Sequence, residues 1–233
     1  MKAIRRHLME LAMLASVLLS GCGAHVYHKV EPGETLYSIS WIYGYDFKDI
    51  AAWNGIRAPY AVTSGQRLRV APDVEGPPGV AVTAPVNTAR PHTSVTDKTA
   101  TAIEDTETEK TIIWSWPASG KIVNRFTNEQ SMKKGLDIGG KLGQPVYSAA
   151  AGRVAYRGHG IVGYGELIII KHSQSYLSAY AHNHEILVKE GENVKPGQMI
   201  ARMGDSGTTF PHLHFQIRRD GKPVDPMKYL PKL

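Results

Sequence analysis

The sequence contains a single cysteine, Cys22, among its 233 residues. An intramolecular disulfide is therefore excluded, although the exported compartment that the N-terminus indicates would permit one. The sequence also lacks any block of lysine and arginine that resembles a nucleic-acid-binding motif, and its formal net charge is only +6. A modest positive charge favours an anionic cell-wall polymer as the partner, and we do not expect nucleic acid to bind.

The N-terminal apolar run, residues 11–19, is too short to cross a bilayer comfortably. Basic residues precede it, and the sequence Leu19-Ser20-Gly21-Cys22 follows. This order is typical of a secretory signal peptide. Leu-Ser-Gly-Cys resembles a bacterial lipobox, in which the cysteine is lipid-modified and becomes the first residue of the mature protein. We therefore expect residues 1–21 to be removed and Cys22 to carry the lipid.

A lipid on Cys22 implies attachment to a membrane. Each buried methylene contributes about 0.8 kcal/mol, so several acyl chains give a stable anchor. Gly23 follows the cysteine, where an aspartate would resemble the signal for retention in the inner membrane. We expect the chain to lie on the inner leaflet of an outer membrane and to face the periplasm.

Residues 25–71 predict a small strand–helix–helix–strand unit. An extended piece meets a Pro-Gly turn, and Thr35 is a suitable N-cap for a helix in which Leu36, Ile39, Ile42 and Tyr43 recur at helical spacing. A second helix fits residues 46–53, and a strand ends the unit near Val70.

The successive segments V-x-P-G-E-T-L, I-x-x-W-N-G-I and S-G-Q-R-L-R-V of this unit resemble a LysM domain. The resemblance implies binding to the N-acetylglucosamine-containing glycan strands of peptidoglycan. It places the groove between the first turn and the loop after the second helix. The residues that it implicates are Gly33, Glu34, Thr35, Leu36, Asn54, Gly55 and Ile56. Leu36 and Ile56 could instead be core residues only, and in so small a fold both roles are compatible.

Residues 72–111 are poor in large apolar side chains and rich in Pro, Ala and Thr. Neither the helical nor the strand period is present. Such a segment cannot bury enough surface to offset its ordering entropy, so we expect a disordered, semi-extended linker.

Residues 112–233 contain short runs of β-branched and aromatic residues separated by glycines. This pattern predicts an all-β domain of antiparallel sheets. The whole chain is therefore expected to be mainly β, with a small α+β domain of order βααβ in front of the all-β domain.

His212 and His214 lie in the segment Phe-Pro-His-Leu-His-Phe near the C-terminus. In a strand their side chains point to the same face, an arrangement that suits zinc or a metal ligand beside a catalytic histidine. A pair of exposed strand histidines is the simpler alternative.

The segments K-G-L-D-I, P-V-Y-S-A-A-A-G-R-V, Y-G-E-L-I-I-I-K-H, Y-A-H and P-H-L-H-F-Q-I together resemble the LytM (lysostaphin-like) zinc metallopeptidases. In active members a His-x-x-x-Asp motif and the last His of His-x-His hold zinc. The resemblance implies Asp137 and His214 as ligands here, with position 133 as the third, and His182 and His212 as catalytic partners.

Position 133, however, is a lysine. A protonated lysine has no acceptor for a metal and would repel a dication. The other histidines of the domain, His159, His172 and His184, could in principle supply a replacement ligand. We expect a vestigial site without catalytic residues or cofactor, and zinc only if a replacement exists.

A LysM domain, a linker and a ligand-deficient LytM domain on a lipoprotein resemble the NlpD-type murein hydrolase activators. This family implies activation of a periplasmic N-acetylmuramoyl-L-alanine amidase during daughter-cell separation, with recruitment to the septum. The chain departs from the family pattern in retaining His182 and both histidines of His-x-His. The alternative is a zinc-dependent peptidoglycan endopeptidase with an altered ligand set.

Overall fold

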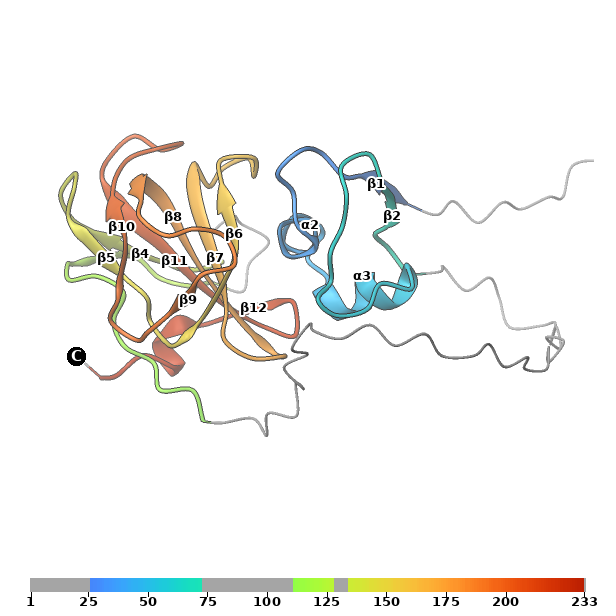
Figure 1. Cartoon of the computed structure of the whole chain (residues 1–233). Helices are drawn as coiled ribbons and strands as arrows, with labels where there is room; N and C mark the ends of the chain where they lie inside the picture. The colour runs from blue at the N-terminus through green and yellow to red at the C-terminus, as the bar shows by residue number, and fades with distance from the viewer. Residues whose placement is uncertain (1–25, 73–110, 128–133, 233) are drawn as a thin grey trace, which may run out of the picture.

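The computed structural model describes residues 26–72, 111–127 and 134–232. The signal segment, Cys22, nearly all of the expected linker and Lys133 lie outside these described residues. Within the described ranges there is no helix long and apolar enough to cross a membrane. The chain is mostly β, with a small helical unit followed by a β-rich domain, as the sequence predicts (Figure 1).

The N-terminal unit has the predicted order of strand, helix, helix and strand. Its elements are β1 (Tyr27–Lys29), α2 (Leu36–Tyr43), α3 (Phe47–Trp53) and β2 (Arg67–Arg69), and β1 pairs with β2 in antiparallel register. The predicted N-cap is confirmed, because the Thr35 side chain accepts from the backbone N–H of Ser38 while the Ser38 side chain accepts from that of Thr35. Gly44, at φ 73°, ends α2.

The core of this unit lies between the helices and the strand pair. It contains Val30, Leu36, Ile39, Phe47, Ile50, Ala51, Leu68 and Val70. Ile42, expected at the helical spacing of these residues, is 45% exposed, whereas the neighbouring Trp41 is only 3% exposed. The second domain, rather than the unit's own core, covers the face of α2 that carries Trp41.

The C-terminal domain is built on a twisted antiparallel sheet. In the part of the chain that the structure describes, the main strand order is β3-β4-β11-β8-β7-β6-β9, with β12 on β11 and β10 joining β5 to β8. The strands are β3 (Ile122–Asn124), β4 (Leu136–Gly139), β5 (Pro145–Tyr147), β6 (Gly152–Gly158), β7 (Glu166–Lys171), β8 (Tyr176–Ile186), β9 (Asn193–Val194), β10 (Met199–Met203), β11 (His212–Arg219) and β12 (Lys222–Val224), followed by the 3₁₀ turn η1 (Pro226–Lys228).

Strand β11 divides its side chains between two environments. Leu213, Phe215 and Ile217 enter the main core with Leu136, Ile138, Tyr180 and Ile200. Because side chains alternate along a strand, His212, His214, Gln216 and Arg218 share the opposite face. That face carries the expected histidine site at one end and meets the N-terminal unit at the other.

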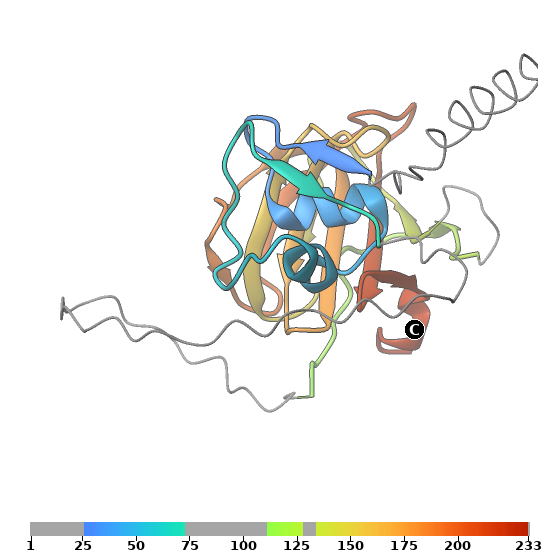
Figure 2. The same ribbon diagram turned by 90° about the vertical axis from the view of Figure 1, so that its right-hand side faces the viewer.

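The two domains pack against each other through α2. Figure 2 shows the N-terminal unit in front of the strands of the sheet. Trp41 joins a buried cluster with Tyr156, Leu167, Ile169 and other apolar residues of the sheet. The guanidinium carbon of Arg218 lies 3.6 Å from the centroid of the Trp41 ring, and Arg218 Nη1 donates to the Trp41 carbonyl at 3.0 Å. The sheet therefore extends its apolar face under the helix.

Candidate functional site

The four site residues expected on the C-terminal domain, outside position 133, lie together. Asp137, His182, His212 and His214 line one cavity of about 330 Å³. Lys134 and the loop of residues 162–164 complete its lining. Residues separated by as many as 77 positions in the sequence are thus brought to a single concave site.

Strand pairing brings these residues together. In the sheet register His214 is opposite Asp137 on β4 and opposite Ala181 on β8. Gly135 permits the close approach of the chain before β4 to β11, because a Cβ there would lie 2.4 Å from the Phe215 carbonyl oxygen and 3.0 Å from His214 Cε1. The K-G-L-D motif therefore needs its glycine for packing as well as its aspartate for the site.

His182 reaches the cavity through an irregularity in β8. Its φ is 63°, a left-handed conformation that is uncommon for a residue with a side chain. Its backbone N–H donates to the Tyr164 carbonyl at 2.9 Å, and its Nδ1–H donates to the Ser206 carbonyl at 2.7 Å. These bonds hold the ring against His212, with ring centroids 4.7 Å apart.

Asp137 and His214, the two expected zinc ligands that the structure describes, both form hydrogen bonds to other side chains. His214 Nδ1–H donates to Asp137 Oδ1 at 2.5 Å, and Asn124 donates to the second carboxylate oxygen at 2.7 Å. The other ring nitrogen, His214 Nε2, accepts from the Gln216 amide at 2.8 Å. Burial acts to raise the pKa of Asp137, but the bonds from His214 and Asn124 outweigh it and hold that pKa below its usual value.

The surroundings of the His182 ring favour its neutral form. Burial lowers its pKa, the bond to Ser206 opposes this effect, and the neighbouring His212 and His214 lower the pKa further. His212 donates from Nδ1 to the Phe210 carbonyl at 3.0 Å. In their neutral forms both rings therefore keep Nε2 as an acceptor. Such a pair could accept a proton or a hydrogen bond from a molecule in the cavity.

The described residues fit zinc poorly. Asp137 and His214 are only two of the ligands that the zinc site would need, because a catalytic zinc takes three protein ligands. Among residues 26–72, 111–127 and 134–232, no group of three or more His, Cys, Asp or Glu side chains could hold a metal ion. Lys133, the residue at the third ligand position, lies outside the described residues.

The other histidines do not repair the site. His172 bonds to the Ala151 carbonyl and to Ser178, and its ring packs 4.9 Å from Trp114. His159 lies 3.5 Å from Glu166 with its side chain 84% exposed, and His184 is also exposed. These three histidines are not among the residues that line the cavity.

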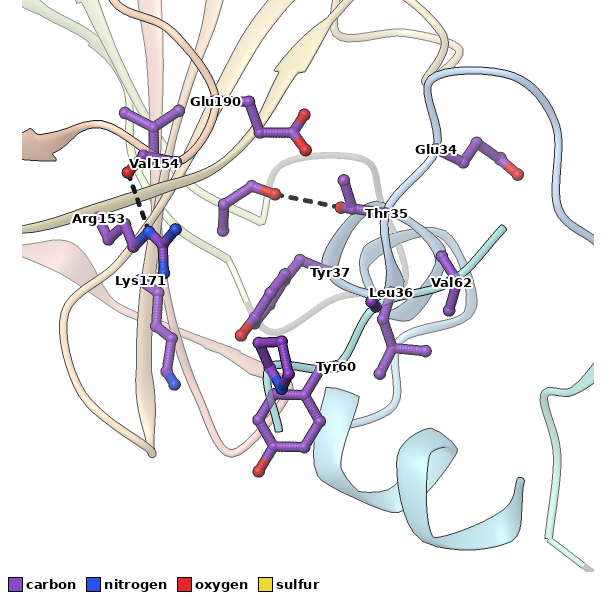
Figure 3. Close-up of a pocket in the computed structure, with 14 residues that line it drawn as sticks. Glu34, Thr35, Leu36, Tyr37, Tyr60, Val62, Arg153, Val154, Lys171 and Glu190 are labelled. Atoms are coloured by element: carbon purple, nitrogen blue, oxygen red, sulfur yellow. Dashed lines mark hydrogen bonds between the residues drawn. The ribbon is translucent and has the colours of Figure 1, made fainter. Parts of the chain in front are cut away.

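The residues expected to bind glycan divide into two groups. Glu34, Thr35 and Leu36 line a separate cavity of about 300 Å³ beside α2 (Figure 3). Asn54 instead joins α3 to β2, because its amide donates to the Ile50 and Arg69 carbonyls and its oxygen accepts from Arg69 N–H. The loop side of the cavity is formed by residues 59–62 rather than by 54–56.

One residue of the histidine cavity, Tyr164, could not be recognised from the motifs. Tyr164 accepts from Gln216 at 3.1 Å, and its ring contacts both His214 and Trp41 edge-on. Tyr164 thereby connects the cavity to the N-terminal unit. The only signal for it in the sequence is its place in the Y-G-E-L segment, which says nothing of these contacts.

Comparisons with known families match two separate segments of the chain. The model of the LysM domain matches residues 28–71, and that of peptidase family M23 matches residues 131–226. Among solved structures, a zinc-containing peptidase from Vibrio cholerae is 33% identical, covering 51% of this chain and 41% of its own, with a TM-score of 0.48.

Curated relatives extend the similarity over most of the chain. An NlpD/LppB homolog lipoprotein of Pseudomonas aeruginosa is 46% identical, over 87% of this chain and 76% of its own length. The murein hydrolase activator NlpD of Escherichia coli is 37% identical, over 88% and 68%. The lipoprotein YgeR of Escherichia coli is 37% identical, over 95% and 92%. The chain belongs to the NlpD/LppB family of lipoproteins, in which a LysM domain precedes a peptidase family M23 domain.

Proposed function

We propose that this chain is a regulator of peptidoglycan hydrolysis and not itself the hydrolase. It binds glycan strands through the LysM domain and activates a periplasmic N-acetylmuramoyl-L-alanine amidase, which splits the septal wall as daughter cells separate. Relatives named murein hydrolase activator support the regulatory role.

The observation that carries the proposal is the lysine at the third ligand position of the M23 domain. Asp137 and His214 remain, and among the described residues no third ligand joins them. A metallopeptidase needs three protein ligands and an open position for the zinc-bound water that attacks the substrate. A site without this arrangement keeps a shaped cavity but loses the nucleophile. The cavity is then available as a surface for a partner protein.

Anchoring completes the proposal. Lipidation of Cys22 would place the chain on the periplasmic face of the outer membrane, next to the wall. Relatives named lipoproteins and outer membrane antigenic lipoproteins support this location. Peptidoglycan and the amidase are the partners, and no nucleic acid is expected.

A zinc-dependent peptidoglycan endopeptidase is the second candidate. The convergence of Asp137, His182, His212 and His214 on one cavity favours it. If a third ligand came from outside the described residues, His182 and His212 could serve a bound water.

Lysis of purified sacculi, combined with metal analysis, separates the two candidates. The full chain should contain far less than one zinc per molecule and should leave sacculi intact, whereas the chain with an N-acetylmuramoyl-L-alanine amidase should lyse them faster than the amidase alone. Lys133→His restores the missing ligand type and should raise zinc content, while Lys133→Gln is the matched control. Stoichiometric zinc with lysis by the unaltered chain alone would contradict the regulatory role.

A further inference from the structure

The cavity beside α2 is walled by both domains. The LysM side consists of residues 34–37 and the loop of residues 59–62. The M23 side consists of β6 residues 153–155, Lys171 at the end of β7 and the turn at 190–191. Figure 3 shows the tyrosines of the LysM side facing Arg153 and Lys171 across this space. A glycan that fills this cavity would contact both domains.

The two walls are held together by specific contacts. Thr35 Oγ1 donates to the Ala155 carbonyl at 3.2 Å, next to the cavity. Away from it, a Cβ on Gly221 would lie only 2.4 Å from Asp46 N, so the β11–β12 turn lies directly against the loop between α2 and α3. Lys48 adds an ion pair to Asp220 at 3.6 Å. The M23 wall is thus a fixed part of the cavity.

The surfaces of the cavity differ in character. Leu36, Tyr37, Tyr60 and Val62 give the LysM side an apolar and aromatic surface, which suits the C–H face of a sugar ring. The M23 side carries the charged residues Arg153, Lys171 and Glu190. Arg153 is exposed, and its Nε donates to the Gly191 carbonyl at 2.9 Å, which fixes the guanidinium at the rim.

A guanidinium fixed in this way offers its remaining N–H groups as a planar fork that matches a carboxylate. Lys171 supports the positive charge, with Nζ 5.7 Å from the centroid of the Tyr60 ring. Glu34 does not compensate the charge of Arg153. Glu34 accepts from Glu31 N–H and lies 2.6 Å from His28, and its carboxylate points away from Arg153 in Figure 3. Glu190 is a separate acceptor that suits hydroxyl or acetamide N–H groups.

We infer that the LysM groove and the M23 domain form one composite site for an N-acetylated glycan that carries a carboxylate, which Arg153 binds. This inference rests on the proposed binding of peptidoglycan glycan and names the ligand class of that site. In peptidoglycan the carboxylate comes either from the lactyl group of N-acetylmuramic acid, once the peptide has been removed, or from the attached peptide. Chitin oligomers present the same acetamides without a carboxylate.

Calorimetric titration of the full chain with three oligosaccharides tests the inference. The ligands are chitotetraose, a peptide-free tetrasaccharide with free lactyl carboxylates, and the same tetrasaccharide carrying peptides. Arg153→Gln should lower affinity for the peptide-free or the peptide-bearing ligand by about tenfold, as expected for a charge-assisted hydrogen bond, and should change chitotetraose affinity by less than about twofold. The ligand that loses affinity identifies the source of the carboxylate.

Two further variants serve as controls for the effect of Arg153→Gln on affinity. Arg202→Gln, at an exposed arginine of β10 that pairs with Glu185, should leave all three affinities unchanged. Ala61→Trp, on the LysM side, should fill the cavity and weaken all three ligands. If Arg153→Gln changed no affinity, or lowered all three equally, the composite site would be refuted while glycan binding stood. If the unaltered chain bound none of the ligands, the proposed glycan binding would itself be refuted.

Discussion

At the scale of single residues, the motifs predict which side chains gather but not what holds them. Asp137, His182 and His214 could be assigned to one site because their family pattern is specific. Their bonding could not, because the contact of His214 with Asp137 depends on the register in which β4 pairs with β11. The left-handed backbone at His182 has no signal in the sequence, since the fold imposes it on a residue type that seldom adopts it.

His172 should make stability depend on pH. Burial lowers its pKa from 6.5 to about 4, so the unfolded chain takes up a proton at a higher pH than the folded chain does. The free energy of unfolding should therefore fall as pH drops from about 6.5 to about 4, by at most about 1.4 kcal/mol per pH unit from this group. Urea unfolding across this range measures the slope.

In the same titration His172→Gln should flatten the slope. Some dependence should remain, because the pKa of His182 is also lowered. Asp137 contributes only below its ordinary pKa of 3.8, outside this range. An unchanged slope in the variant would show that His172 does not titrate as described.

Gly135→Ala should destabilise the M23 domain. The new Cβ would lie 2.4 Å from the Phe215 carbonyl oxygen and 2.6 Å from Gln216 Cγ, so β11 must shift. We expect a loss of about 1–3 kcal/mol in the free energy of unfolding, as for overpacked sites. Gly160→Ala is the control, because its Cβ would meet only the Tyr156 hydroxyl, at 3.3 Å. Equal losses in both variants would contradict the close-approach argument.

At the scale of elements, the helices and most strands follow from local patterns, whereas the packing of α2 on the sheet does not. The amphipathic pattern of α2 predicts one buried face, yet Trp41 is buried on another. Its partner Arg218 lies 177 residues away, and nothing in the spacing of either residue signals the contact. Contacts between domains depend on the finished surfaces of both, so a single sequence reveals them poorly.

Arg218→Ala should weaken the packing of the LysM domain against the M23 domain. The substitution removes a cation–π contact and a hydrogen bond to the Trp41 carbonyl, which together we expect to weaken docking by about 2 kcal/mol. Small-angle X-ray scattering should then report a larger radius of gyration. Lys222→Ala, at an exposed residue of β12, should leave the radius unchanged. Scattering from Arg218→Ala identical to that of the unaltered chain would show that this contact does not hold the domains together.

At the scale of the whole molecule, the chain combines a LysM domain with a peptidase family M23 domain that has lysine at the third ligand position. Fold class and family could be predicted because each domain carries several independent motifs. The composite cavity could not, because its walls come from positions as distant as Glu34 and Glu190. In the proposed account, the amidase carries out the hydrolysis, and this chain binds the peptidoglycan and activates the amidase.

The products released from sacculi by the full chain together with an N-acetylmuramoyl-L-alanine amidase test this account most directly. Amidase action separates free peptides from glycan strands, whereas endopeptidase action breaks cross-links and leaves the peptides on the glycan. We predict that the chain accelerates release of free peptides, that His182→Gln still does so, and that a catalytically inactive amidase abolishes the release. Loss of cross-links with the peptides still attached, produced by the chain alone and abolished by His182→Gln, would contradict the account.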